Sequence, residues 1–82
     1  MRIKLTKHAG SKIAERNISL DTIRVVVTDP DQEEMDRFDD SLVHFIGRVE
    51  NRFLRVIGRW EGEGEFVVVS AFFDRRLKKG DK

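Results

Sequence analysis

The side chains of this chain that could take part in acid–base and phosphate chemistry are two histidines and a group of arginines. His8 and His44 are the only imidazoles, and imidazole is the side chain best matched to proton transfer near neutral pH. Arg48, Arg55 and Arg59 lie in a stretch of alternating apolar residues. A guanidinium stays charged and can meet two phosphate oxygens at once. These residues predict a surface that holds something anionic.

A predicted strand from Phe53 to Trp60 positions two of the arginines. Side chains of a strand alternate between the two faces of a sheet, which divides this segment into two sets. The core set is Leu54, Val56, Gly58 and Trp60. The other set is Phe53, Arg55, Ile57 and Arg59. Because the second set mixes apolar and cationic side chains, we expect its face to be covered by a ligand or partner.

Two helices are predicted after a short first strand. Thr6 and Ser19 have side chains favoured at helix N-caps, and each precedes apolar residues at helical spacing. Pro30 ends the second helix, because the residue before a proline is pushed out of helical geometry. Arg16 is predicted to anchor the carboxyl end of the sheet through its head group. The predicted elements are a strand over residues 2–5 and helices over residues 7–16 and 20–28.

The rest of the chain is predicted to form an exposed loop followed by three strands. From Asp29 to Asp40 there are seven acidic residues and one arginine, so residues 31–40, which have no apolar periodicity, are interpreted as a loop. The order strand–helix–helix–strand–strand–strand predicts an α+β fold with both helices packed on one face of an antiparallel sheet. The three strands are predicted over residues 42–49, 53–60 and 66–73.

Pairing the three strands assigns side chains to a covered and an open face of this sheet. The side covered by helices is expected to hold Phe45, Leu54, Val56, Trp60, Val67 and Val69. The open side is expected to hold His44, Ile46, Arg48, Phe53, Arg55, Ile57, Arg59, Phe66, Val68, Ser70 and Phe72. A slip of one residue in the register would exchange every assignment in the shifted strand.

Length and composition restrict the classes of protein. The 82 residues predict one domain over residues 1–82, with a short charged tail from about residue 74. The absence of cysteine excludes disulfides and thiolate metal sites, and two distant histidines make a poor zinc set. No apolar run reaches the roughly 20 residues that span a bilayer, and the amino terminus lacks a signal-peptide core. We therefore expect a cytoplasmic protein without a metal or other cofactor.

A set of short motifs runs through nearly the whole chain. They are Thr6-x-His8-Ala9, Glu15-Arg16-x-Ile18-Ser19, the helix end at Asp29-Pro30, Leu54-Arg55-Val56 and a valine-rich last strand. Together they resemble a widespread family of small domains of unknown function that is usually placed with the RelE/ParE toxin superfamily. The resemblance implies a RelE-like fold, in which two helices precede an antiparallel sheet.

The resemblance also implies the toxin-like component of a toxin–antitoxin pair, which either cleaves RNA or blocks DNA gyrase. RNA cleavage needs proton transfer at the 2′-hydroxyl and the 5′-oxygen, and a cationic group that holds the charge on phosphorus. The predicted catalytic residues are His8, which lies at the family's histidine position, together with His44, Arg55 and Arg59. The predicted RNA-binding residues, toward free or ribosome-associated RNA, are Arg48, Arg75 and Arg76.

One departure from the family pattern restricts the mechanism. The last strand of the family tends to read Val-x-Thr-x-Tyr, whereas this chain has Val68-Val69-Ser70-Ala71-Phe72 and no tyrosine at all. A mechanism that depends on tyrosine is therefore excluded.

A non-catalytic interaction module is the alternative prediction. Here the open face binds an antitoxin-like protein, DNA gyrase or a second copy of the chain, because apolar patches mark interfaces. The arginines would then pair with Glu61, Glu63 or Glu65, or contact the partner. The two predictions differ in whether the arginines lie within reach of an imidazole. The predicted partner-binding residues are Phe53, Ile57, Phe66, Val68 and Phe72.

Overall fold

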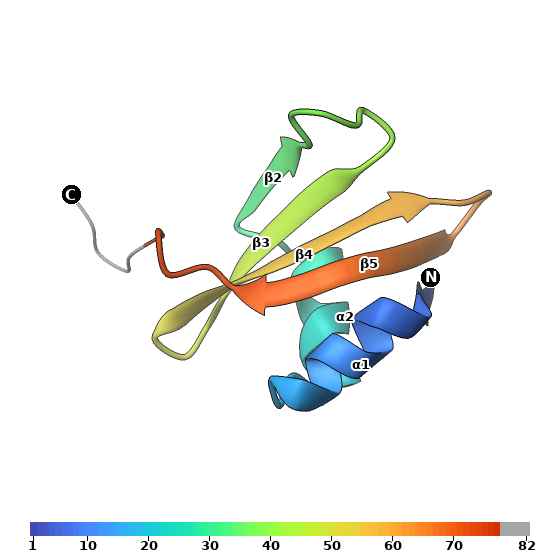
Figure 1. Cartoon of the computed structure of the whole chain (residues 1–82). Coiled ribbons are helices and arrows are strands. Elements are labelled where there is room, and N and C mark those ends of the chain that lie inside the picture. Colours follow the sequence, from blue (N-terminus) through green and yellow to red (C-terminus); the bar gives the residue numbers. More distant parts are fainter. Residues whose placement is uncertain (78–82) are drawn as a thin grey trace.

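The computed structural model describes residues 1–77 of the chain, which form two helices and one sheet (Figure 1). Strand β1 (Arg2–Leu5) leads into helices α1 (Lys7–Glu15) and α2 (Leu20–Thr28). The part of the predicted tail beyond residue 77 lies outside the described residues. The remaining strands are β2 (Gln32–Met35), β3 (Val43–Val49), β4 (Arg52–Trp60) and β5 (Glu65–Phe73).

The sheet is mixed, with the strand order β1-β5-β4-β3-β2. Strands β2 to β5 pair antiparallel with their neighbours, whereas β1 pairs parallel with β5. The predicted α+β class is confirmed, but the prediction of a purely antiparallel sheet is wrong for β1. No hairpin joins β1 to β5, because both helices and three strands lie between them, so no tight turn imposes an antiparallel orientation on this pair.

Both helices cover the same face of the sheet (Figure 1). Thr6 Oγ1 accepts a hydrogen bond from the backbone N–H of Ala9, and Ser19 Oγ accepts one from Thr22, which confirms the two predicted N-caps. The buried helical and sheet side chains form one cluster between the layers. Its members are Ala9, Ile13, Ile18, Ile23, Val26, Val27, Val43, Phe45, Leu54, Val56, Phe66, Val68 and Ala71.

The segment that was interpreted as an acidic loop contains an edge strand. Strand β2 pairs antiparallel with β3, from Gln32 opposite Ile46 to Met35 opposite Val43. All four of its residues are exposed, and charged side chains are common on edge strands because they discourage pairing with other chains. The apolar alternation that predicts a strand is therefore missing. The loop prediction is wrong over residues 32–35.

A bulge in the pairing of β4 with β5 overturns part of the predicted face assignment. The register jumps from Ser70 to Val68, which leaves Val69 as an extra residue in β5. An extra residue moves every side chain on one side of the bulge to the other face. Phe66 and Val68, predicted to bind a partner on the open face, are instead fully buried in the core under the helices. That prediction is wrong.

Three residues that were expected in the core under the helices are not part of the core cluster. Val67 lies opposite Arg59 on the other face of the sheet, and Val69 is only half-buried. Trp60 is 49 % exposed, and its ring meets the ring of Phe66 edge-on with 5.0 Å between centroids. The prediction that Val67 and Val69 lie in the core under the helices is wrong, although Val67 is buried, at 8 % exposure, on the open face. Trp60 keeps its predicted face, opposite Phe66, but is not buried there. The core predictions for three other residues are confirmed. The confirmed residues are Phe45, Leu54 and Val56.

Gly58 lies at the bulge, in a position that leaves no room for a side chain. A β-carbon there would collide with the carbonyl oxygen of Val67 and lie 2.7 Å from the ring of Phe66. Strand backbone and a fully buried ring cannot withdraw at low cost. We expect Gly58→Ala to lower the free energy of unfolding, measured in urea, by about 1–3 kcal/mol through overpacking.

Gly10→Ala is the matched control for this prediction. A β-carbon at Gly10, in α1, has no heavy atom within 4 Å. We expect it to raise the free energy of unfolding by about 0.5–1 kcal/mol, since alanine favours a helix interior over glycine. A Gly58→Ala variant as stable as wild type would contradict the close packing at the bulge.

Candidate functional site

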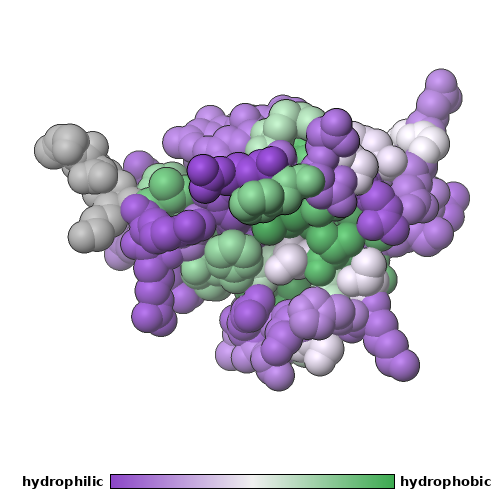
Figure 2. All heavy atoms as spheres, turned by 45° about the horizontal axis from the view of Figure 1, so that its top comes forward, coloured by the Kyte–Doolittle hydropathy of each residue, from purple (hydrophilic) through white to green (hydrophobic). Residues whose placement is uncertain are grey.

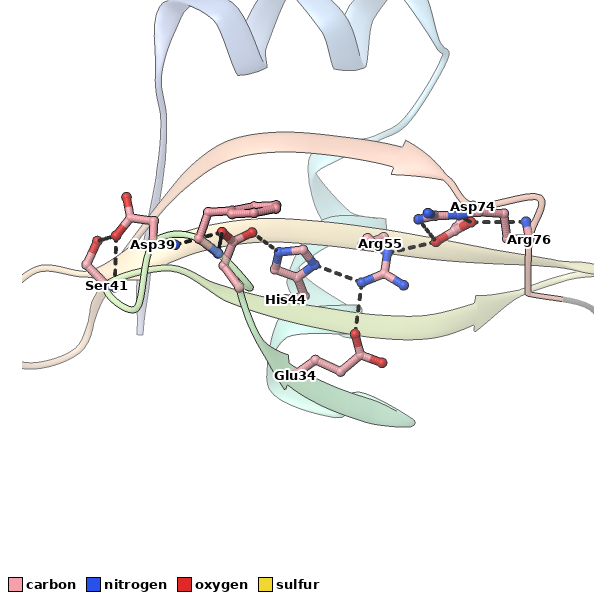
Figure 3. A network of polar contacts seen from close by, with 9 residues as sticks. Glu34, Asp39, Ser41, His44, Arg55, Asp74 and Arg76 are labelled. Carbon is pink, nitrogen blue, oxygen red and sulfur yellow. Dashed lines mark hydrogen bonds and ion pairs between the residues drawn. The ribbon is translucent and has the colours of Figure 1, made fainter.

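Polar side chains from four parts of the sheet converge on Arg55, on the face that the helices leave open (Figure 3). Arg55 lies in β4, His44 in β3 and Glu34 in β2, while Asp74 and Arg76 follow the end of β5. These residues are distant in the sequence and are brought together by the strand pairing. The network is therefore a product of the tertiary fold.

Arg55 is buried together with the groups that compensate its charge. It is 7 % exposed and Asp74 is 4 % exposed. The Nε of Arg55 donates to Asp74 Oδ2 at 2.8 Å, and its Nη1 donates to Glu34 Oε1 at 3.2 Å. Arg76 donates from Nε and Nη2 to the two oxygens of Asp74, each at 3.0 Å. A buried charge is tolerated only when it is paired and hydrogen-bonded in this way.

His44 is held in one neutral tautomer by two hydrogen bonds. Its Nδ1 lies 2.7 Å from Nη1 of Arg55, and its Nε2 lies 2.7 Å from Oδ1 of Asp36. A guanidinium can only donate and a carboxylate can only accept, so Nδ1 must accept and Nε2 must carry the proton. Both ring nitrogens are engaged. His44 consequently has no lone pair left to take a proton from a substrate.

Two carboxylates beside Arg55 and His44, those of Asp74 and Asp36, have lowered pKa values. Hydrogen bonds from Arg76, and then from Arg55, hold the pKa of Asp74 far below its ordinary value of 3.8, against the opposing effect of burial. The hydrogen bond from His44, with a second from the backbone N–H of Phe38, lowers the pKa of Asp36. At neutral pH the network is therefore a set of opposite charges that satisfy one another.

A cavity of about 530 Å³ adjoins the network. Three cationic side chains, Arg37, Arg55 and Arg76, are balanced in its wall by three carboxylates, so the cavity carries no excess of positive charge. The apolar part of the wall includes side chains that are open to solvent, with Phe38 93 % exposed and Met35 61 % exposed. The other wall residues are Glu34, Asp36, His44, Asp74 and Leu77.

The structure brings together two of the four predicted catalytic residues, His44 and Arg55, and leaves the other two apart. His8 is exposed on the first turn of α1, in the helical layer on the opposite side of the sheet. Arg59 donates from Nε to Glu61 at 2.9 Å, which is one of the alternative pairings considered for it. The predicted grouping of all four around one phosphate does not form.

The three predicted RNA-binding arginines lie in three different surroundings. Arg48 lines a hollow between α2 and β3, and its backbone N–H donates to Asp31. Arg76 is bound to Asp74 in the network. Arg75 is exposed in a separate hollow that contains two other arginines. These residues do not form one continuous phosphate track.

Three of the predicted partner-binding residues, Phe53, Ile57 and Phe72, are half-buried side chains that belong to the open face by their register. The carboxylates Glu34, Asp36 and Asp74 were not predicted as site residues. No local pattern marks them, because the burial of Arg55 that requires carboxylate partners is set by the fold, whereas Arg59 on the same strand stays partly exposed.

Within residues 1–77, no group of three or more histidine, aspartate or glutamate side chains is arranged to hold a metal ion. Neither helix of this part of the chain is long and apolar enough to cross a membrane. Comparisons with protein-family models, curated proteins and solved structures found no match. The function has to be inferred from the geometry of the chain itself.

The burial of Arg55 leads to a prediction about stability. Arg55→Met removes one of the two arginines that hold Asp74 and leaves that carboxylate buried with a single partner. We expect the free energy of unfolding, measured in urea, to fall by about 3–5 kcal/mol. Arg59→Met, on the same strand but in an exposed pair with Glu61, should change it by no more than about 1 kcal/mol. Equal small losses in both variants would contradict the buried pair.

The lowered carboxylate pKa values predict a loss of stability in acid. The folded-state pKa of Asp74 lies below the unfolded-state value, near 3.8, so its contribution is present above that pH and is lost as the pH falls through the folded-state pKa. Asp36 also has a lowered pKa, so its contribution to stability is lost in acid in the same way. The free energy of unfolding, measured in urea from neutral to strongly acidic pH, should decline below about pH 4. In Asp74→Asn this decline should be smaller. An equally steep decline in that variant would exclude Asp74 as its cause.

Proposed function

We propose that this chain is a toxin-like interaction module that binds a protein partner on the open face of its sheet, at the cavity beside Arg55. The observation that carries the proposal is the closed network, in which Arg55 and both ring nitrogens of His44 are already engaged by neighbouring side chains. Such a network stiffens a surface but offers no free base for attack on a phosphodiester. RNA cleavage by His44 and Arg55 has correspondingly less support.

Charge balance favours a protein over RNA at this cavity. A phosphate that approached Arg55 would compete with Asp74 and Glu34, which lie 2.8 Å and 3.2 Å from its nitrogens. It would also meet the carboxylate of Asp36 in the same wall. Nucleic-acid sites depend on an excess of cationic over anionic groups. This cavity has no such excess, because its arginines and carboxylates are equal in number.

The rim of the cavity has the apolar side chains that an interface needs. Met35, the last residue of β2, and Phe38, in the turn after it, are exposed, and both line the cavity together with Leu77. Figure 2 shows apolar residues at the surface between hydrophilic ones on one face of the molecule. Exposed aromatic and apolar side chains next to a cavity are typical anchors of protein interfaces.

The charges around the rim indicate which chemistry the partner segment should have. Asp39 and Asp40 are exposed on the turn that follows β2. A segment with an apolar side chain for the cavity and lysine or arginine on its flanks would complement this rim. The arrangement of a first strand, two helices and three long antiparallel strands also supports the RelE-like fold that the resemblance implies.

The test measures partner binding and RNA cleavage with the same purified proteins. The product of the adjacent reading frame is the candidate partner, because toxin and antitoxin are encoded together. We expect it to bind the wild-type chain in sedimentation velocity, and Phe38→Ser to weaken binding about tenfold or more, as for an interface anchor. Val25→Ser is the control, since Val25 is 62 % exposed on α2, in the other layer.

The same proteins are incubated with total RNA to test the rival function. Intact RNA is the expected result. Cleavage that disappears in a folded His44→Gln variant would contradict the proposal and favour the ribonuclease prediction. Equal binding by wild type, Phe38→Ser and Val25→Ser would place the interface elsewhere on the chain.

A further inference from the structure

A second group of arginines lies away from the network, where the end of α1, the start of β4 and the end of β5 come together. Arg16, Arg52 and Arg75 line one hollow of about 420 Å³ with Phe72 and Phe73. All three arginines are exposed. They come from three different elements, so the tertiary fold concentrates positive charge at this corner of the molecule.

No carboxylate neutralises this group within the described part of the chain. The ion pairs of residues 1–77 involve Arg55, Arg59 and Arg76 among the arginines from β4 onward, but not Arg52 or Arg75. The lining of the hollow contains no acidic side chain. An excess of guanidinium groups without carboxylates attracts anions, and phosphate is the anion that the guanidinium fork fits best.

Two of the three arginines are already held in place. Arg16 donates from Nη1 to the carbonyl oxygen of Ala71 at 2.8 Å, which confirms its predicted anchoring role although its side chain is exposed. The guanidinium of Arg52 lies over the ring of Phe73, 3.7 Å from the centroid. Each contact leaves other N–H groups for a ligand, and a side chain that is held loses less entropy when it binds.

The hollow continues into a neighbour of similar size. The second hollow, also of about 420 Å³, shares Arg52, Phe73 and Arg75 with the first and adds Asn51, Phe53 and Leu77. Its acidic residue, Asp74, is buried and already bonded to Arg55 and Arg76. A cationic part beside an aromatic part is the combination that binds a phosphate and the base attached to it.

We propose that this corner binds a nucleotide unit, with its phosphate on Arg16, Arg52 and Arg75 and its base against the phenylalanine side chains of the adjoining hollow. The nucleotide can belong to a free nucleotide or to a single-stranded nucleic acid, since both present the same phosphate and base. The three arginines of this site do not line the cavity beside Arg55. The adjoining hollow shares two lining residues with that cavity, Asp74 and Leu77, and Asp74 is already bonded to Arg55 and Arg76.

The test compares two double variants that remove the same charge. Arg52→Gln/Arg75→Gln changes the proposed site, whereas Arg24→Gln/Arg59→Gln changes exposed arginines that do not line either hollow. The probes are a labelled single-stranded RNA of about 8 nucleotides, ATP and inorganic phosphate, and urea unfolding verifies that each variant is folded. We expect the site variant to lose about tenfold or more in affinity for the oligonucleotide or ATP, and the control to lose much less.

The dependence on salt gives a second readout. Each phosphate contact to a single strand contributes about 0.7 to the slope of log affinity against log salt, so two lost contacts should lower that slope by roughly 1.4. Tighter binding of the oligonucleotide than of ATP would identify a nucleic-acid strand as the ligand, and equal binding a free nucleotide. Equal losses in both double variants, binding of inorganic phosphate as tight as ATP, or no binding of any probe at low salt would overturn the proposal.

Discussion

The open face of this protein depends on the burial of one charged side chain, Arg55. A guanidinium in the middle of a sheet has to be neutralised where it lies, because an uncompensated buried charge costs several kcal/mol. That requirement brings Glu34 from the edge strand β2 and Asp74 from the end of β5 to the same point, and His44 from β3 beside them. One side chain of β4 thereby links both halves of the sheet, and it engages His44, the one predicted catalytic histidine on this face.

Side chains of one type have different roles here because their neighbours differ. Arg55 and Arg76 share Asp74 and serve the fold, whereas Arg16, Arg52 and Arg75 meet no acidic side chain in their hollow. The number of arginines in the sequence cannot distinguish paired arginines from unpaired ones, because the net charge includes both kinds. Which arginines meet a carboxylate depends on which strands are adjacent in the sheet. The fold thereby places a balanced, partly apolar surface over the network and a cationic surface at the far corner, which suit different ligands.

The bulge between β4 and β5 has a comparable influence on the core. By leaving Val69 without a partner, it turns Phe66 and Val68 toward the helices, where the ring of Phe66 fills the space beside Gly58. The open face loses two large apolar residues as a result. The exposed apolar residues Phe38 and Met35 come instead from a segment that is dominated by acids in the sequence. The most exposed apolar side chain of this surface, Phe38, therefore lies next to the edge strand, while Phe53, Ile57 and Phe72 remain half-buried on the face of the sheet.

The sequence by itself determined the elements whose signals are local: the N-caps at Thr6 and Ser19, the two helices, the three long strands and the open-face position of Arg55. Only the tertiary structure decided what depends on partners distant in the chain. Strand β2 exists because β3 supplies its hydrogen bonds, and the faces of β5 depend on a bulge that no residue pattern marks. The tautomer of His44 likewise depends on Arg55 and Asp36. Each ring nitrogen donates or accepts a hydrogen bond according to the group that the fold places opposite it.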